Sequence, residues 1–467
     1  MTTTSPASAV PYTHTLPCGM RVICAPSATD VVYCGIAVDA GTRDELPDEN
    51  GLAHFCEHLT FKGTHRRRSW HILNRMESVG GDLNAYTGKE ETIYYTAFLK
   101  EHFARAVDLL ADIVLGSTYP QTEMNKEVEV VIDEIESYND SPSELIFDDF
   151  ENLIFCGHPL GRNILGEAGR LRGFRSEDIQ RFARRLYRPD RMVFFVYGRI
   201  EPAYACREIT KALKRVASSL PEGHPFQTLL QTDASPARPD RNDAGRTAVP
   251  EYRPQTVTLH KDTHQAHVMI GARAYSARDP RHLSLYLLNN ILGGPGMNSR
   301  LNLSLREKHG LVYTVESVMT TYTDTGLWNV YFGCDPHDVA RCRRLVLKEL
   351  RRLAEAPLAP HALEAAKRQI KGQIGISYDN FENVALAMGK TFLHYDRARD
   401  LNRLYQKIDG LTAEDLHAVA QELFRPENAC QKAINHSQSN VKRISAKRKF
   451  NRLRLVFHLA EIDLPLS

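Results

Sequence analysis

The alternation of apolar and polar positions near the start of the chain predicts a sheet. Stretches rich in β-branched residues at 21–26 (RVICAP) and 31–41 (VVYCGIAVDAG) predict two strands, the second closed by Gly41. LNAYT at 83–87 and ETIYYTAFL at 91–99 flank a short polar turn and predict a hairpin. A mainly antiparallel sheet is therefore expected in the first half of the chain.

Helical periodicity follows these strands. Asn50 is placed to cap a helix over 51–61 (GLAHFCEHLTF), and Ser69 to cap a second helix that ends at the glycines 80 and 81. Apolar residues recur at helical spacing over 101–116 and 122–138, which predicts two longer helices.

Residues 216–255 concentrate Pro, Asp, Ser and Gly without clear periodicity, which is typical of an interdomain linker. The segment after it repeats the opening in outline, with strand patterns at 256–262 and 266–276 and a helical pattern that begins at His282. The sequence therefore predicts an α+β protein of two similar halves, 1–215 and 256–430, each an antiparallel sheet packed by helices on one side.

Composition narrows the class of protein. The chain has 467 residues, 42% of them hydrophobic and 25% charged, which is ordinary for globular domains and excludes a disordered or fibrous chain. The net charge of +2 gives no reason to expect a nucleic-acid or membrane-surface partner. Nine cysteines at irregular spacings without a CxxC pair favour reduced thiols.

The two ends of the chain carry different signals. The first twenty residues lack the apolar stretch of a secretory signal, and the first arginine is Arg21, so a cytoplasmic protein is expected and a mitochondrial matrix protein is disfavoured. No apolar run approaches the roughly 20 residues of a membrane span. Residues 431–456 hold eight Lys or Arg and no acid, which predicts a solvated basic tail over 431–467 or an arm that binds a polyanion.

The chemistry-bearing motif is His54-Phe55-Cys56-Glu57-His58, an HxxEH string within the first predicted helix. Residues four apart lie about 40° apart around a helix axis, so His54 and His58 can aim at one point, with Glu57 close by. Two imidazoles suit zinc, and a neighbouring carboxylate can accept a proton from water. The alternative is a surface helix with two incidental histidines.

A catalytic zinc needs a third protein ligand. The predicted helix 122–138 offers Glu127, Glu129, Asp133, Glu134 and Glu136. Glu127 and Glu134 share one face because they are seven residues apart, and this spacing alone does not choose between them. An acidic solvated face remains the alternative.

Taken together, these segments resemble the pitrilysin/insulinase family of inverzincin metallopeptidases, in which HxxEH is followed about 75 residues later by a glutamate ligand. The likeness extends to GTRDE before the motif, GGDLNAYTGKEET after it, HPLGRNILG at 158–166 and YRPDRMVFFVYG at 187–198. Within the family, the chain resembles the compact subfamily that includes the mitochondrial processing peptidase beta subunit and its bacterial homologues.

This resemblance implies a role for each site residue. His54, His58 and Glu134 would bind one Zn2+ per chain, Glu57 would be the general base, and Glu127 would support the site. In the second half, which lacks HxxEH, Arg306 and Tyr313 match a family pair that reaches across an interdomain cleft to the substrate. Without the resemblance, an Arg on a helix and a buried strand Tyr would be the simpler interpretation.

Two further assignments rest on the same likeness. Asn84, Ala85 and Tyr86 match the family's edge strand, where a substrate pairs as an added strand through its main chain; a plain sheet-edge role is the alternative. Cys56 could be a fourth ligand or a redox control point, but positions between the ligands rotate away from the metal face, so packing is expected.

The implied function is a zinc endopeptidase whose two halves form a clamshell around unfolded peptides or presequence-like segments. A non-catalytic structural subunit of the same fold is the alternative. Because one chain carries both the metal and the Arg/Tyr elements, a homodimer or a self-sufficient subunit is expected. The family's apolar closing strand is replaced after about residue 428 by CQKAINHSQSNVKRISAKRKF, which leaves the last strand of the second half open.

Overall fold

Segments from both halves of the sequence are interleaved in two units. The computed structural model describes residues 10–231, 246–261 and 263–436. Unit 1 comprises residues 1–137, 162–248 and 378–399, and unit 2 comprises residues 138–161, 249–377 and 400–467. The contiguous halves expected from the sequence are therefore not the compact units, because 138–161 and 378–399 each lie in the other unit.

Unit 1 is built on a six-stranded sheet of order β1-β2-β6-β3-β5-β4. Neighbouring strands are antiparallel except for β2 and β6, which are parallel. The two strands predicted at the start of the chain are present with β6 between them, and the predicted hairpin is formed by β4 and β5. The bounds are β1 Tyr12–Thr15, β2 Arg21–Pro26, β3 Val31–Val38, β4 Asp82–Thr87, β5 Thr92–Leu99 and β6 Met192–Gly198.

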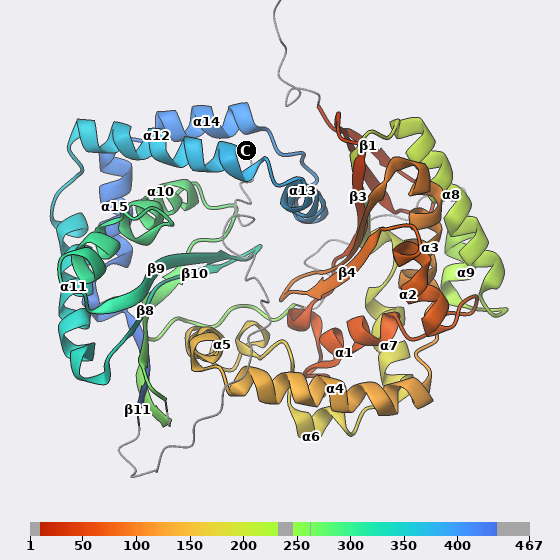
Figure 1. Ribbon diagram of the computed structural model, residues 1–467, viewed down its shortest axis with the longest axis horizontal. Helices are drawn as coiled ribbons and strands as arrows, with labels where there is room; N and C mark the ends of the chain where they lie inside the picture. The colour runs from red at the N-terminus through yellow and green to blue at the C-terminus, as the bar shows by residue number, and fades with distance from the viewer. Residues whose placement is uncertain (1–9, 232–245, 262, 437–467) are drawn as a thin grey trace, which may run out of the picture. The chain divides into compact units, whose positions relative to one another are not determined.

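Helices cover both faces of this sheet (Figure 1), whereas one covered face was expected. Ile36 and Phe194 point to the face packed by the helices of the first half, and Ala37 and Val193 point to α13. A methyl group on Gly389 of α13 would lie 2.5 Å from the Phe195 ring, so glycine is needed for this close approach. The helices are α1 Leu52–Thr60, α2 Ser69–Glu77, α3 Phe103–Gly116, α4 Gln121–Asn139, α6 Ala168–Leu171, α7 Ser176–Leu186, α8 Pro202–Ser219, α9 Pro225–Gln231 and α13 Phe381–Tyr395.

Unit 2 repeats this plan, and the two halves are homologous. Its sheet has the order β7-β11-β8-β10-β9, and α5 packs on β8 and β11. The strands are β7 Thr256–Lys261, β8 Ala266–Ala274, β9 Val312–Thr321, β10 Gly326–Cys334 and β11 Cys430–His436. The helices are α5 Pro142–Ile154, α10 His282–Gly293, α11 Val339–Glu355, α12 Pro360–Ser377, α14 Leu401–Gly410 and α15 Ala413–Leu423.

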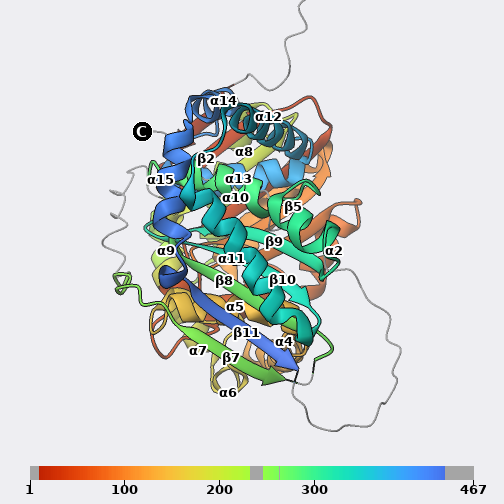
Figure 2. The same ribbon diagram turned by 90° about the vertical axis from the view of Figure 1, so that its left-hand side faces the viewer.

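Strand β11 corrects the expected boundary of the basic tail. It lies between β7 and β8, as Figure 2 shows, so the closing strand is present despite its polar composition. Cys430, Lys432 and Ile434 are buried at alternate positions, and the Lys432 Nζ lies 3.4 Å from a carboxylate oxygen of Asp149 on α5. An ion pair thus lets a lysine occupy a core position. The rest of the expected tail, 437–467, lies outside the described residues.

The described residues of the expected linker include regular structure and contacts within unit 1. Helix α8 extends to Ser219, α9 occupies 225–231, and Arg246 packs in unit 1 with a side chain that is 10% exposed. The Arg246 guanidinium donates to Asp44 at 2.9 Å and lies near Glu90 and Asp39. Within the described part of the chain, no helix combines the length and apolar character that crossing a bilayer requires.

Candidate metal centre

Helix α1 presents the HxxEH motif from a buried position. Its N-cap is Gly51, not the expected Asn50, and Gly51 has φ of 91°, where a side chain would be strained. Glu45 caps the helix instead: its Oε1 accepts a hydrogen bond from the Ala53 N–H at 2.8 Å. Burial raises the pKa of Glu45 to about 8, against the opposing hydrogen bonds from Ala53 and Gly51. The buried Glu45 side chain therefore fixes the start of α1, the helix that carries the HxxEH motif.

Three side chains converge where the sequence predicts a metal. Glu134 Oε2 lies 3.8 Å from His54 Nε2 and 3.6 Å from His58 Nε2, and all three donor atoms lie within 4.8 Å of one another. Donors of a tetrahedral zinc are about 3.3 Å apart, given Zn–N and Zn–O bonds of about 2.0–2.2 Å. The two His–Glu distances need only a small contraction, so the donor set fits zinc. Among the described residues, no other group of three such side chains gathers in this way.

Glu127 contacts the ring nitrogen of His58 that faces away from Glu134, Nδ1. Its Oε1 lies 3.0 Å from His58 Nδ1, and its Oε2 lies 2.6 Å from Lys62 Nζ. A carboxylate at Nδ1 keeps the proton on that nitrogen and leaves the Nε2 lone pair for a metal. The structure therefore separates two glutamates that the spacing alone left equivalent: Glu134 faces both Nε2 atoms, and Glu127 contacts Nδ1.

Glu57 is buried beside this cluster. Its Oε2 accepts a hydrogen bond from Thr87 Oγ1 at 2.8 Å, which ties α1 to the end of β4. Burial raises the pKa of Glu57, and the charge of His58 and the Thr87 hydrogen bond offset part of that increase. A carboxylate with a raised pKa is a better proton acceptor than an exposed one, as a general base requires.

The histidines differ in their electrostatic surroundings. Burial, with a smaller contribution from His58, lowers the pKa of His54 to about 3, so this imidazole is neutral near pH 7. Burial also opposes the charge on His58, but the hydrogen bond to Glu127 and the charges of Glu57 and Glu134 outweigh it and raise the pKa of His58. Positive charge at this point, whether a proton or a metal ion, is therefore favoured by the surrounding carboxylates.

The remaining predicted site residues lie on other elements. Arg306 is in the short π-helical segment η7 Asn302–Glu307, and Tyr313 is near the start of β9, both in unit 2. Tyr313 is 83% exposed, which excludes the buried strand tyrosine of the simpler interpretation. Asn84, Ala85 and Tyr86 lie on β4, the edge strand of the unit 1 sheet, and their contact with substrate stays a prediction.

Cys56 packs behind the metal face as expected. It is buried, its Sγ lies 3.7 Å from the Tyr119 hydroxyl, and burial raises its pKa to about 12. The sequence did not predict three residues that support the site, Lys62, Thr87 and Glu45. Lys62 lies four residues after His58, so helical spacing could have indicated it, but Thr87 and Glu45 act through contacts that local pattern does not encode.

Comparison with known proteins identifies the family. A model described as insulinase (peptidase family M16) matches residues 21–168, and one described as the peptidase M16 inactive domain matches residues 173–370. An uncharacterized zinc protease of Mycobacterium tuberculosis is 32% identical over 421 residues, covering 90% of this chain and 92% of the relative. The uncharacterized zinc protease YmxG of Bacillus subtilis is 30% identical over 412 residues, covering 88% and 95%.

Solved structures agree on the fold. A protease from Helicobacter pylori superposes with a TM-score of 0.78 at 20% identity, covering 91% of this chain and 99% of that structure. A peptidase M16 inactive domain from Pseudomonas fluorescens gives 0.78 at 17% identity, covering 92% and 100%. The convergence of His54, His58 and Glu134, the two family models and relatives at about 30% identity along most of the chain lead to one conclusion: this protein belongs to the insulinase (peptidase M16) family.

Proposed function

We propose that this protein is a zinc-dependent endopeptidase that cleaves unfolded peptides or presequence-like segments. The observation that carries the proposal is the convergence of His54, His58 and Glu134, with the buried carboxylate of Glu57 beside them. When bound, zinc would lower the pKa of coordinated water and polarise the scissile carbonyl. The names of the relatives, zinc proteases, support the same metal.

The chain's own groups divide the remaining work. Glu57 accepts the proton of the attacking water and delivers it to the leaving amine, and Thr87 holds its carboxylate in place. Glu127 orients His58 through Nδ1. The main chain of β4 at Asn84, Ala85 and Tyr86 pairs with an extended substrate, which favours unfolded over folded substrates.

Unit 2 contributes the second element of this proposal. Arg306 and Tyr313 donate hydrogen bonds to the substrate carbonyl, since a guanidinium and a phenol both stabilise developing negative charge on oxygen. Both side chains are exposed, so they are available to a ligand. Because both elements belong to one chain, a homodimer or a self-sufficient subunit follows.

The decisive experiment changes one atom of the proposed base. In Glu57→Gln, kcat/KM for an internally quenched peptide should fall about 10²–10⁴-fold while zinc content stays at one per chain. Glu129→Gln is the matched control, because Glu129 lies on α4 with an exposed side chain paired to Arg172. Its activity should stay within about twofold of the parent, as is usual for an exposed pair.

Chelation of the parent protein should abolish cleavage, and stoichiometric zinc should restore it. Undiminished cleavage in Glu57→Gln would refute the assignment of the base. A parent protein that holds zinc but cleaves no unfolded peptide would instead favour the non-catalytic structural subunit.

A further inference from the structure

The turn that joins β4 to β5 comes directly after Thr87, the residue that holds the Glu57 carboxylate. This β4–β5 turn comprises residues 88–91, and a hydrogen bond of 2.7 Å from its first N–H to its last carbonyl closes it. Thr87, the last residue of β4, pairs with Thr92, the first residue of β5. The position of the turn therefore sets the position of the Thr87 hydroxyl, which donates to Glu57.

Two charged residues anchor one side of the β4–β5 turn within unit 1. Lys89 Nζ donates to the Arg162 carbonyl, and the Lys89 carbonyl accepts from the Arg43 N–H at 2.8 Å. Glu90 Oε1 accepts from the Arg43 guanidinium at 2.7 Å and lies 3.4 Å from that of Arg246, a residue of the expected linker. The turn is therefore held partly by a segment that lies far away in the sequence.

Helix α13 anchors the third charged residue of the turn, Glu91. This helix belongs to unit 1 although it lies near the end of the chain, and Figure 1 shows it in blue beside β3. Lys390 Nζ lies 3.0 Å from Glu91 Oε1, and His394 Nε2 lies 2.8 Å from Glu91 Oε2. Lys390 and His394 are four residues apart, so both project from one face of α13.

These three side chains are largely withdrawn from solvent. The side chains of Glu91 and His394 are 5% and 1% exposed, and that of Lys390 is 22% exposed. Burial opposes the ionisation of Glu91, but the charge of Lys390 and the hydrogen bond to His394 hold its pKa well below the usual range. Glu91 is therefore an anion, and each of its carboxylate oxygens has a partner on α13.

The attachment of α13 to the sheet does not depend on these charges. The helix already packs through an apolar cluster that includes Met388, Phe392 and Phe195. Desolvation offsets much of the attraction within a buried ion pair, so such a pair adds little net stability relative to apolar residues of similar size. What the charged groups add is a defined position, because both oxygens of the carboxylate meet their partners in one arrangement only.

We propose that Lys390 and His394 are positioning residues for the general base Glu57. They hold Glu91, Glu91 holds the β4–β5 turn, and the turn places the Thr87 hydroxyl against the Glu57 carboxylate. Residues near the end of the chain thus align a base near its start. This inference rests on the peptidase function proposed above, because it concerns the same base, and one of its tests needs no cleavage.

The first test compares Glu91→Met/Lys390→Met with the parent, both full-length and zinc-loaded, on an internally quenched peptide. Methionine is unbranched and leaves no unpaired carboxylate or ammonium, so the unfolding midpoint should stay near that of the parent. Loss of a direct partner of a site residue costs about 10–100-fold in activity, and this pair acts one contact further away, so kcat should fall about threefold to thirtyfold. KM should stay within about twofold, because neither residue is placed against the substrate.

A double-mutant cycle with Thr87→Val shows whether the effect passes through Thr87. In the Thr87→Val background, Glu91→Met/Lys390→Met should change kcat by less than about twofold, because the hydrogen bond that they align is already missing. Losses that multiply would overturn the proposed route. Lys390→Arg, which keeps the charge beside Glu91, should retain most of the parent kcat.

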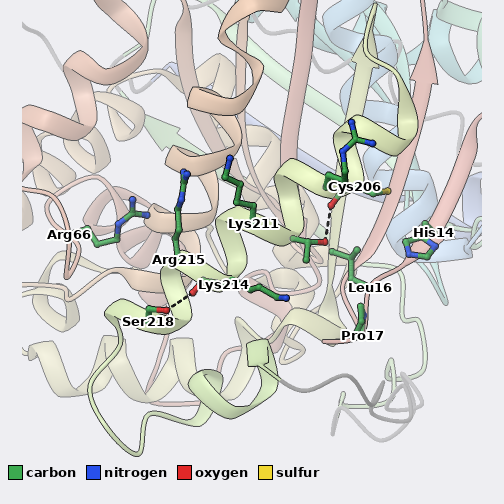
Figure 3. A pocket seen from close by; sticks show the side chains of 11 residues that line it. His14, Leu16, Pro17, Arg66, Cys206, Lys211, Lys214, Arg215 and Ser218 are labelled. Atoms are coloured by element: carbon green, nitrogen blue, oxygen red, sulfur yellow. Dashed lines mark hydrogen bonds between the residues drawn. The ribbon is translucent and has the colours of Figure 1, made fainter.

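The matched control is Lys211→Met/Glu382→Met, which makes the same two kinds of substitution in unit 1. Lys211 lines a groove of about 840 Å3 along α8, and no residue of the turn or of α13 lines this groove (Figure 3). Glu382 accepts a hydrogen bond from Tyr95 at 2.8 Å, at the opposite end of α13 from His394. The zinc content of this variant should be unchanged, and its kcat should stay within about twofold of the parent.

A crystal structure of the Glu91→Met/Lys390→Met protein gives a second readout, independent of cleavage. The distance from Thr87 Oγ1 to Glu57 Oε2, 2.8 Å in the parent, should lengthen beyond about 3.5 Å. An unchanged distance, an unchanged kcat in the folded variant, or a loss of zinc that accounts for the fall in kcat would overturn the positioning role. A parent that holds zinc but cleaves nothing would refute the proposed peptidase, and the crystal distance would still decide whether α13 positions Glu57.

Discussion

Helices α1 and α10 hold corresponding places in the two halves, and they use their polar residues differently. In α1, His54, Glu57 and His58 gather with Glu127 and Glu134, so five ionisable groups meet in one place. In α10, His282 is fully buried and its Nε2 lies 2.9 Å from Thr321 Oγ1.

The later part of α10 is also held by neutral polar groups. Further along α10, Asn289 Oδ1 accepts a hydrogen bond from Ser317 Oγ, which in turn accepts one from Trp328 Nε1. These neutral groups satisfy one another, so α10 is held by its polar residues. In α1, by contrast, the Nε2 atoms of His54 and His58 face the Glu134 carboxylate at 3.8 and 3.6 Å, distances longer than hydrogen bonds. The same fold thus stabilises one helix with neutral hydrogen bonds and keeps the other ready for a cation.

The strongest test of this contrast removes one buried histidine from each helix. His54→Ala should reduce zinc from one per chain to a trace. Loss of a residue that hydrogen-bonds to a metal ligand weakens metal binding about 10–100-fold, and loss of a ligand itself should weaken it more. His282→Ala should leave zinc content unchanged and destabilise unit 2 by about 2–4 kcal/mol, through a cavity and a lost hydrogen bond.

Metal analysis after dialysis and urea unfolding of the chelated proteins would measure both effects. Full zinc retention in His54→Ala, or zinc loss in a folded His282→Ala protein, would remove the functional distinction between the helices.

Local pattern was sufficient for most of the fold. Strands 21–26 and 31–38 and the helices near 103–116 and 121–139 lie close to their expected positions, because burial on defined faces imposes a clear period. Strand β11 was missed because Lys432 occupies an inward position that only its ion pair with Asp149 makes tolerable. The transfer of α13 into unit 1 could not be anticipated, because it depends on long-range packing against Phe195.

The site, like the fold, was predicted from the sequence only where local spacing determines it. The HxxEH spacing predicts two histidines aimed at one point, and the structure confirms that they converge with Glu134. The spacing of Glu127 and Glu134 could not assign their roles, since both lie on one face of α4 and differ only in which imidazole nitrogen they meet. Glu45 lies outside α1 altogether, so no periodicity could relate it to the start of that helix.

A second contrast concerns the starts of the two helices. The Glu45 pKa is raised to about 8, so in the folded protein this group binds a proton that the unfolded chain releases near pH 4.5. Its stabilising contribution is therefore present at low pH and is lost as pH rises through about 8. The contribution to the free energy of unfolding should fall by about 1.4 kcal/mol per pH unit at its steepest.

Glu45→Gln should flatten the fall in urea midpoint between pH 5 and 8 in metal-free protein, since the amide keeps an oxygen acceptor for α1. Asp279, near the start of α10, is the matched acid. A hydrogen bond from Arg281 lowers its pKa despite partial burial, so it is already ionised in this range. Asp279→Asn should not change the slope between pH 5 and 8, and a parallel flattening there would contradict the special role of Glu45.

The smallest expected effect concerns two lysines, one in each unit. Lys62 contacts Glu127 rather than His58, so Lys62→Met should weaken zinc binding by less than loss of a direct partner of the ligand, about threefold to tenfold. Lys367→Met is the control: its Nζ donates to Glu364 and to the Asp409 carbonyl in unit 2, and zinc affinity should not change. Competition with a fluorescent chelator measures both, and Lys62→Arg should restore most of the affinity because it keeps the charge beside Glu127. Equal zinc affinity in Lys62→Met and the parent would show that Glu127 orients His58 without help from Lys62.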